Sequence, residues 1–209
     1  MGYMLEIQNI HKTFNPGTIN EKVALNGVNL NLNPGDFVTI IGGNGAGKST
    51  TLNAIAGVWS VDEGKIIIDG VDITKLSEHK RALYLGRVFQ DPMTSLNPII
   101  TIGKQITSVI MKHQHVSEVE ARAQALELME KVGIPNAEQR FDDYPFQYSG
   151  GMRQRIVIAI ALSCRPKILI CDEPTTALDV TIQSKILELI QEIQKKRQLS
   201  VIYITHDLG

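Results

Sequence analysis

A glycine-rich octapeptide constrains this chain more than any other feature of its sequence. Gly42-Gly43-Asn44-Gly45-Ala46-Gly47-Lys48-Ser49 matches the pattern G-x-x-x-x-G-K-[ST]. A short apolar run at residues 37–41 precedes it and predicts a strand, and residues 49–56 have helical character that ends at Gly57. Because the pattern binds phosphate when it joins a strand to a helix, we expect a phosphate-binding loop here and not a chance match.

The spacing of this loop has a physical cause. A loop that wraps a phosphate turns successive backbone N–H groups inward, and it needs backbone angles that glycine adopts at low cost. The helix that follows adds its free N-terminal donors and partial positive charge. Lys48 is expected to reach the β- and γ-phosphates of a nucleotide, and Ser49 to place its hydroxyl on Mg²⁺. Thr50 and Thr51 are candidate donors to the α-phosphate.

Two adjacent acids, Asp172 and Glu173, follow a second apolar run at residues 167–171. Such a run is typical of a strand covered on both faces, which delivers the residues at its end to the edge of the sheet. We expect Asp172 to hold Mg²⁺, directly or through water, and Glu173 to orient the attacking water. Acids after a strand also occur as helix caps and turns, but the phosphate loop favours the catalytic interpretation.

Strand and helix patterns alternate along the rest of the chain. Further strands are expected at residues 5–10, 23–32, 65–68 and 200–205, and further helices at 117–132, 152–162 and 181–196. Residues 91–150 form a mainly helical insertion, in which Ser117 and Glu120 compose a capping box. This order predicts a largely parallel sheet with helices on both faces, a small antiparallel sheet, and ligands at the carboxyl ends of the strands.

Composition excludes several other classes of protein. The 209 residues carry a formal net charge of −1, so there is no overall basic field to hold nucleic acid, although the net charge leaves a local basic patch open. No apolar run approaches the length of a membrane span. No leader-like segment opens the chain, so we do not expect a secreted protein. Cys164 and Cys171 lie in apolar stretches without a C-x-x-C pattern, so we expect free thiols in a reducing compartment.

Other motifs carry a family resemblance. Tyr148-Ser149-Gly150-Gly151-Met152-Arg153-Gln154 resembles the signature of the ATP-binding cassette (ABC) ATPases, whose usual form is leucine-serine-glycine-glycine-glutamine. Asp172-Glu173-Pro174-Thr175-Thr176-Ala177-Leu178-Asp179 resembles their Walker B motif and D-loop. Gln90 is placed like the glutamine of their Q-loop, His206 like their switch histidine, and Phe14 like the aromatic residue that stacks on adenine. The motifs stand in family order and cover essentially the whole chain.

The resemblance implies an α/β fold in one ATP-binding domain. A P-loop NTPase (RecA-like) core with a mainly parallel sheet would carry a small antiparallel β subdomain and a helical subdomain. The core lobe is expected at about residues 1–89 and 152–209, and the helical lobe at about 90–151. ATP and Mg²⁺ are the implied ligands, and hydrolysis of ATP to ADP and phosphate is the implied reaction.

The resemblance also assigns roles to residues. The implied catalytic residues are Glu173, His206, Lys48 and Gln90, and the implied metal ligands are Ser49, Gln90 and Asp172. The implied nucleotide-binding residues are Phe14, Gly42, Asn44, Gly45, Ala46, Gly47, Lys48, Ser49, Thr50, Thr51, Ser149, Gly150, Gly151 and Asp179. One chain does not need two anion-binding helix starts for one triphosphate. Ser149, Gly150 and Gly151 are therefore expected to close over the ATP of a second cassette in a head-to-tail dimer, with Asp179 crossing the interface.

The sequence departs from the family pattern in two places. Tyr148 and Met152 replace the leucine and glutamine of the usual signature, while the serine and two glycines are kept. The sequence ends at Gly209, soon after His206, where related cassettes continue, so we expect either a fragment or a shortened domain.

Resemblance also indicates a class of partner. Residues 91–209 resemble the ATPase subunits of bacterial di- and oligopeptide (or nickel) importers, and residues 1–92 resemble a cassette of an amino-acid or related small-solute importer. We therefore hypothesise a hybrid chain, joined near Gln90-Asp91-Pro92-Met93. Implied partners are a second cassette and transmembrane permease subunits, at the inner face of the cell membrane. The alternatives are a soluble ABC ATPase of translation or DNA repair, and an inactive truncated or hybrid cassette.

Overall fold

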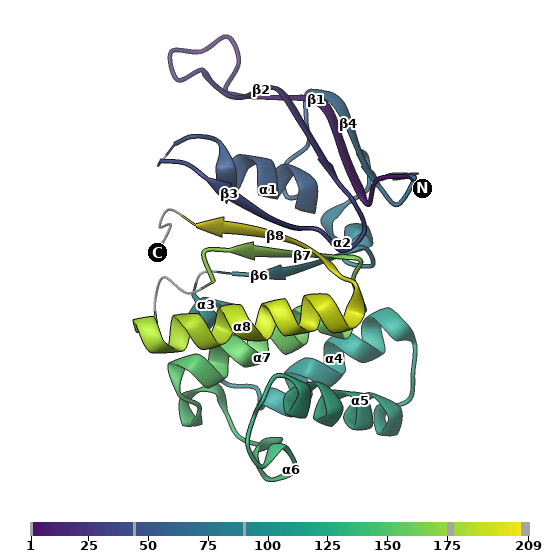
Figure 1. Ribbon diagram of the computed structural model, residues 1–209, viewed down its shortest axis with the longest axis vertical. Helices are drawn as coiled ribbons and strands as arrows, with labels where there is room; N and C mark the ends of the chain where they lie inside the picture. The colour runs from purple at the N-terminus through teal and green to yellow at the C-terminus, as the bar shows by residue number, and fades with distance from the viewer. Residues whose placement is uncertain (1, 44, 90, 175–177, 206–209) are drawn as a thin grey trace.

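Two four-stranded sheets and a group of helices form the chain, stacked in layers (Figure 1). The structure is a computed structural model and describes residues 2–43, 45–89, 91–174 and 178–205. The antiparallel sheet has the order β2 (Lys22–Leu32), β1 (Leu5–Phe14), β4 (Glu63–Ile68), β5 (Val71–Asp72). The parallel sheet has the order β3 (Phe37–Ile41), β8 (Ser200–Thr205), β7 (Ile168–Asp172), β6 (Leu85–Val88). The expected parallel sheet and small antiparallel sheet are therefore confirmed.

Helices cover both faces of the parallel sheet. Helix α1 (Lys48–Ala56) lies between the two sheets, where Leu52 and Ile55 pack with Ile168 and Ile170 of β7 (Figure 1). The opposite face is covered by α7 (Gly150–Ser163) and α8 (Val180–Arg197), and beyond them by α4 (Ile102–Gln114) and α5 (Glu118–Lys131). The short elements are α2 (Glu78–Arg81), α3 (Pro92–Ser95), α6 (Ala137–Arg140) and the 3₁₀ turn η1 (Pro145–Gln147). Helices therefore dominate the segment between β6 and β7, as predicted.

The parallel register brings four loops to one edge of the sheet. Ile41 pairs with Thr205, Asp172 with Ile204, and Val88 with Cys171. Because the strands run in the same direction, the last residues of β3, β6, β7 and β8 lie at the same, carboxyl edge of the sheet. This edge is where the two sequence motifs with phosphate and metal chemistry meet.

Most of the expected elements are present. The capping box at the start of α5 has both of its bonds, since Ser117 Oγ accepts from the Glu120 N–H and the Glu120 carboxylate accepts from the Ser117 N–H at 3.0 Å. Strand β6 and helix α4 were not predicted individually. Cys164 and Cys171 are free thiols, as expected. No helix within the described ranges is both long and apolar enough to span a membrane. The lobe boundaries at residues 89/90 and 151/152 stay a prediction.

Candidate nucleotide-binding site

A cavity of about 160 Å³ lies at the carboxyl edge of the parallel sheet. Its lining consists of Lys22, Ala24, Gly45, Ala46, Gly47, Lys48, Ser49, Thr50 and Glu173. The predicted phosphate loop and the predicted catalytic acid, which are more than 120 positions apart in the sequence, thus share one cavity. Asn44, Gln90 and His206 are predicted site residues that lie outside the described residues.

Glycine is required by the conformation of the loop. Gly45 and Gly47 have φ angles of 82° and 86°, in the left-handed region that costs little only for glycine. A Cβ atom on Gly47 would also lie 2.9 Å from the Ala24 carbonyl oxygen. Gly47 is the N-cap of α1, and its carbonyl accepts the Thr51 N–H at 2.8 Å. The loop therefore passes directly into the helix, whose free N-terminal donors lie beside the cavity.

The charged group of Lys48 lies over the loop that precedes it. Its Nζ donates to the carbonyl oxygens of Gly42 and Gly43, the latter at 2.9 Å. This arrangement places a positive charge among the backbone groups that line the cavity. Thr50 also lines the cavity, whereas the Thr51 hydroxyl donates to the Gly47 carbonyl at 3.0 Å. Thr51 as a donor to the α-phosphate stays a prediction, with its hydroxyl turned into the helix.

Asp172 is the last residue of β7 and Glu173 follows it, and the two acids have different environments. Burial raises the pKa of Asp172, and the nearby Glu173 raises it further, while Arg87 and Lys48 lower it. Glu173 has a φ angle of 48°, which is uncommon for a residue with a side chain, and its N–H donates to the Ile204 carbonyl at 3.1 Å. A half-buried carboxylate that is costly to ionise, beside a second acid, favours a divalent cation.

The residues present fit Mg²⁺. This ion prefers oxygen ligands, keeps several waters, and binds through one or two carboxylates together with substrate phosphates. The Ser49 hydroxyl and the Asp172 carboxylate supply such oxygens at the same edge of the sheet. Among the described residues no group of three or more His, Cys, Asp or Glu side chains is placed to hold a metal. A ligand set that includes the phosphates of a nucleotide agrees with both observations.

The signature segment forms a second helix start, away from this cavity. Ser149 is the N-cap of α7 and is exposed, and its Oγ accepts from the Met152 N–H at 3.3 Å. A Cβ atom on Gly151 would lie 2.9 Å from Cγ2 of Ile182, so glycine allows α7 to pack closely on α8. The segment does not line the cavity of the same chain, and its exposed N-terminus is open to another molecule.

Tyr148 and Asp179 have structural contacts of their own. The Tyr148 hydroxyl donates to the Arg140 carbonyl at 2.7 Å, and burial raises the pKa of Tyr148 to about 12. The tyrosine that replaces the usual signature leucine is thus a buried anchor between α6 and α7. Asp179 is the N-cap of α8, where its carboxylate accepts the Ile182 N–H at 3.0 Å. Its role across a dimer interface stays a prediction.

Phe14 lies at the end of β1 against an aromatic residue that the sequence did not single out. The rings of Phe14 and Trp59 meet edge to face, with centroids 4.9 Å apart and an interplanar angle of 81°. Lys12 Nζ lies 5.7 Å from the centroid of the Phe14 ring. Phe14 is not among the residues that line the cavity at the phosphate loop. Stacking of its ring on adenine stays a prediction.

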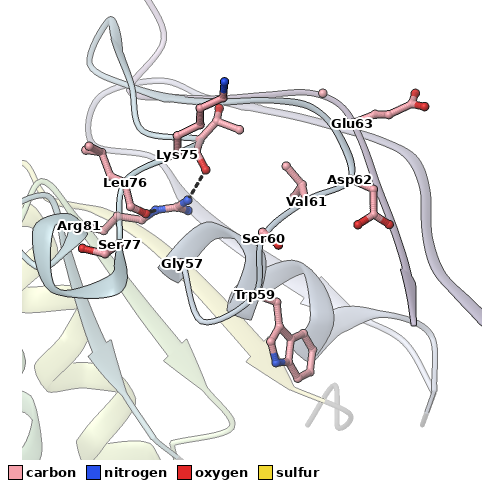
Figure 2. Close-up of a pocket in the computed structure, with 12 residues that line it drawn as sticks. Gly57, Trp59, Ser60, Val61, Asp62, Glu63, Lys75, Leu76, Ser77 and Arg81 are labelled. Carbon is pink, nitrogen blue, oxygen red and sulfur yellow. Dashed lines mark hydrogen bonds between the residues drawn. The ribbon is translucent and has the colours of Figure 1, made fainter. Parts of the chain in front are cut away.

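A second hollow, of about 520 Å³, lies between α1 and the antiparallel sheet, and Figure 2 shows Trp59, Asp62 and Arg81 among its lining residues. The guanidinium of Arg81 donates to the carbonyl oxygens of Leu76, Ala54, Ile55 and Thr74 at 2.6 to 2.9 Å. All three of its nitrogen atoms have main-chain partners, two of which are carbonyls at the end of α1. The contacts of Arg81 in this hollow are therefore structural.

Comparisons with known proteins agree with this site. The sequence model of the ABC transporter family matches residues 25–176. The chain is 52% identical to the oligopeptide transport ATP-binding protein AmiE of Streptococcus pneumoniae over 89% of its length, and 50% identical to OppD of Bacillus subtilis over 90%. It is 46% identical, over its whole length, to the dipeptide transport ATP-binding protein DppD of Bacillus subtilis. The chain spans 55% of the length of AmiE and OppD and 65% of DppD.

Solved structures share the fold. The dimeric ATP-binding cassette MJ0796, bound to ADP and phosphate, superposes with a TM-score of 0.84 at 34% identity, covering 98% of this chain and 89% of that one. The cassette cbiO1 of Clostridium perfringens gives a TM-score of 0.85 at 31% identity, covering 99% and 80%. A phosphate-loop α/β core with a helical insertion and a second helix start defines an ATP-binding cassette. The chain belongs to the ABC transporter family. The hypothesis of two joined lineages stays a prediction, because each of these matches spans both of the proposed parts and none compares them separately.

Proposed function

We propose that this chain binds MgATP, hydrolyses it to ADP and phosphate as one half of a cassette dimer, and thereby powers the import of peptides or another small solute. The observation that carries the proposal is the cavity that the phosphate loop shares with Glu173. Positioning and charge stabilisation supply most of the catalysis in phosphoryl transfer. Both need groups held on rigid elements, which the ends of β3 and β7 and the start of α1 provide.

Each residue at the cavity has a chemical role in this proposal. The N–H groups of residues 45–49 bind the phosphate oxygens, and Lys48 places its positive charge on the β- and γ-phosphates. Ser49 and Asp172 would hold Mg²⁺, which would supply positive charge to offset that of the phosphates. Glu173 accepts a proton from the attacking water and orients it. Gln90 and His206 are proposed to contact Mg²⁺ and the γ-phosphate, and Phe14 to stack on adenine.

The position of the signature segment supports the proposed dimer. Ser149, Gly150 and Gly151 form a helix start at which Ser149 is exposed, and none of the three lines the cavity of its own chain. In a two-fold dimer each such helix start closes over the ATP held by the partner. ATP then favours the closed dimer because only that state supplies both sets of contacts, and hydrolysis removes this preference. The solved structure of MJ0796 is dimeric, which supports dimerisation of this chain.

The partner class comes from the relatives. AmiE, OppD and DppD are named as peptide transport ATP-binding proteins. We propose that this chain likewise works against transmembrane permease subunits, at the inner face of the cell membrane, and that the closure of the dimer is passed to them.

A phosphate-release assay on the purified chain tests the activity. MgATP is the substrate, Lys48→Ala is the inactive comparison, and Lys104→Ala, on the exposed face of α4, is the matched control. We expect turnover in the wild type and in Lys104→Ala, and loss of ATP binding and turnover in Lys48→Ala. No affinity of the wild type for MgATP, or full activity as a strict monomer, would refute the proposal.

Sedimentation tests the class of partner. We expect the chain to co-purify with membranes that carry its permeases, and not to sediment with ribosomes or DNA. Sedimentation with ribosomes or DNA in place of membranes would favour a soluble ABC ATPase, and an absence of hydrolysis in a folded chain would favour an inactive cassette.

A further inference from the structure

A buried glutamine joins the signature helix to the parallel sheet. The side chain of Gln154, on α7, is 0% exposed. Its Nε2 donates to the carbonyl oxygen of Phe89 at 3.2 Å, just beyond the end of β6. Its Oε1 has no hydrogen-bond partner among the described residues. A buried amide whose oxygen lacks a hydrogen bond costs stability. Its presence in a native protein therefore suggests a functional role.

Gln154 contacts the main chain of Phe89, whereas the ring of Phe89 contacts Arg87. Arg87 pairs in register with Ile170, and Ile170 packs toward α1, so Arg87 points to the α1 face. Its guanidinium carbon lies 4.6 Å from the centroid of the Phe89 ring. The Arg87 Nε is also buried without a partner among the described residues. Two of the three such atoms among the described residues, Gln154 Oε1 and Arg87 Nε, therefore belong to side chains that contact Phe89.

Arg87 also shares a face of the parallel sheet with the proposed metal ligand, Asp172. Asp172 is two positions after Ile170 along β7, so its side chain emerges on the same face as that of Arg87. The two charges influence one another, since each counteracts part of the effect of burial on the pKa of the other. Contacts thus run from α7 through Gln154 and Phe89 to Arg87, and Asp172 emerges on the same face of the sheet as Arg87.

We propose that Gln154 is a positioning residue for ATP hydrolysis, which ties the signature helix α7 to the end of β6 and, through Phe89 and Arg87, to Asp172. This inference rests on the proposed function. In the proposed dimer, helix α7 begins with the segment that closes over the partner's ATP. Through Gln154, the position of α7 would therefore affect the position of Asp172 in the same chain. Gln154 does not line the phosphate cavity, and its effect should fall on turnover and not on ATP affinity.

The neighbouring residue provides a matched control. Arg155 follows Gln154 on α7 and also donates one side-chain hydrogen bond to a carbonyl, that of Val132, at 2.6 Å. The Val132 carbonyl lies at the end of α5, within the helical layer and away from β6. Gln154→Met and Arg155→Met each remove one such bond from α7. The bond lost in Gln154→Met joins α7 to the end of β6, whereas the bond lost in Arg155→Met joins α7 to the end of α5.

The experiment measures kcat, the Kd for MgATP and the thermal midpoint for the wild type and both variants. For Gln154→Met we expect kcat to fall about tenfold or more with the Kd within about twofold, and for Arg155→Met a lower midpoint with kcat within about twofold. Combining Gln154→Met with Arg87→Met should lower kcat by less than the product of the single effects, because both act through Phe89.

Other results would overturn the inference. A purely structural role predicts that both methionine variants lower the midpoint alike and leave kcat at the wild-type value. If Gln154→Met does not fold, Gln154→Asn replaces it, because its amide is one methylene too short to reach Phe89; wild-type kcat in a folded Gln154→Asn would also overturn the inference. An inactive wild type would instead count against the proposed function, so the two failures are distinguishable.

Discussion

The backbone N–H of Glu173 donates to the carbonyl oxygen of Ile204 at 3.1 Å, which continues the pairing of β7 with β8 beyond the end of the strand. This bond accompanies a φ angle of 48° at Glu173. A left-handed conformation of a residue with a side chain costs about 1 kcal/mol or more, and such residues cluster at functional sites. The strained backbone directs the Glu173 side chain into the phosphate cavity.

Replacement of Glu173 by glutamine should separate binding from hydrolysis. The amide keeps the size of the side chain but cannot accept a proton from water. We expect Glu173→Gln to bind MgATP with wild-type affinity, to lose about 10²-fold or more in turnover, and to accumulate as an ATP-bound dimer. Single-turnover phosphate release and size-exclusion chromatography with ATP measure these effects. Wild-type turnover in this variant would exclude Glu173 as the base.

The phosphate loop and the acidic strand end were predictable because their chemistry is local. Gly45 and Gly47 need left-handed φ angles, and β7 is apolar on both faces, so the residues themselves carry the signal. Strand β6 was missed because it has only four residues and contains Gly86 and Arg87. A Cβ atom on Gly86 would lie 2.4 Å from the Ala161 carbonyl, a contact with α7 that no local pattern reveals.

Long-range contacts explain the other omissions. The contact of Trp59 with Phe14 joins residues 45 positions apart, and that of Gln154 with Phe89 spans 65 positions. Neither Trp59 nor Gln154 belongs to a periodic pattern that would have predicted its contact. Tertiary packing decides such contacts, and propensity and hydrophobic period do not contain that information.

Activity in trans can be tested by mixing two inactive variants. Ser149→Arg blocks the exposed start of α7, and Lys48→Ala removes the phosphate-binding charge. A heterodimer of the two has one composite site in which both residues are intact. An equal mixture should therefore recover up to about a quarter of wild-type turnover, while each variant alone stays near background.

A control and a contrary result define this mixing test. Ser108→Arg, on the exposed face of α4, should keep wild-type activity by itself. If the mixture forms heterodimers, as seen by pull-down of a tagged variant, and still recovers no activity, the signature segment does not act on the partner's site.

Removal of the Arg81 guanidinium should destabilise the fold without direct effect on the site. Arg81 is buried, and Arg81→Met removes the guanidinium donor from four carbonyl groups, including those of Ala54 and Ile55 at the end of α1. We expect a loss of about 2–4 kcal/mol in the free energy of unfolding, measured by urea denaturation. Arg122→Met removes an exposed ion pair with Glu138 at 2.9 Å and should cost less than about 1 kcal/mol. Equal losses in both variants would contradict the structural role of Arg81.

Acidification should lower the free energy of unfolding in part through His113. The centroid of its ring lies 5.3 Å from that of His79. Burial lowers the pKa of His113 below its ordinary value of 6.5, and the neighbouring His79, Lys112 and His115 lower it further. As the pH falls through about 6.5, the unfolded chain therefore binds a proton that the folded chain does not, and the free energy of unfolding decreases. His113→Gln removes this contribution, so its free energy of unfolding should fall less between pH 8 and pH 5 than that of the wild type. Urea denaturation at both pH values measures the difference, with pH 8 as the reference because histidine is neutral there in both states. An identical decrease in the two proteins would show that His113 titrates alike in the folded and unfolded chains.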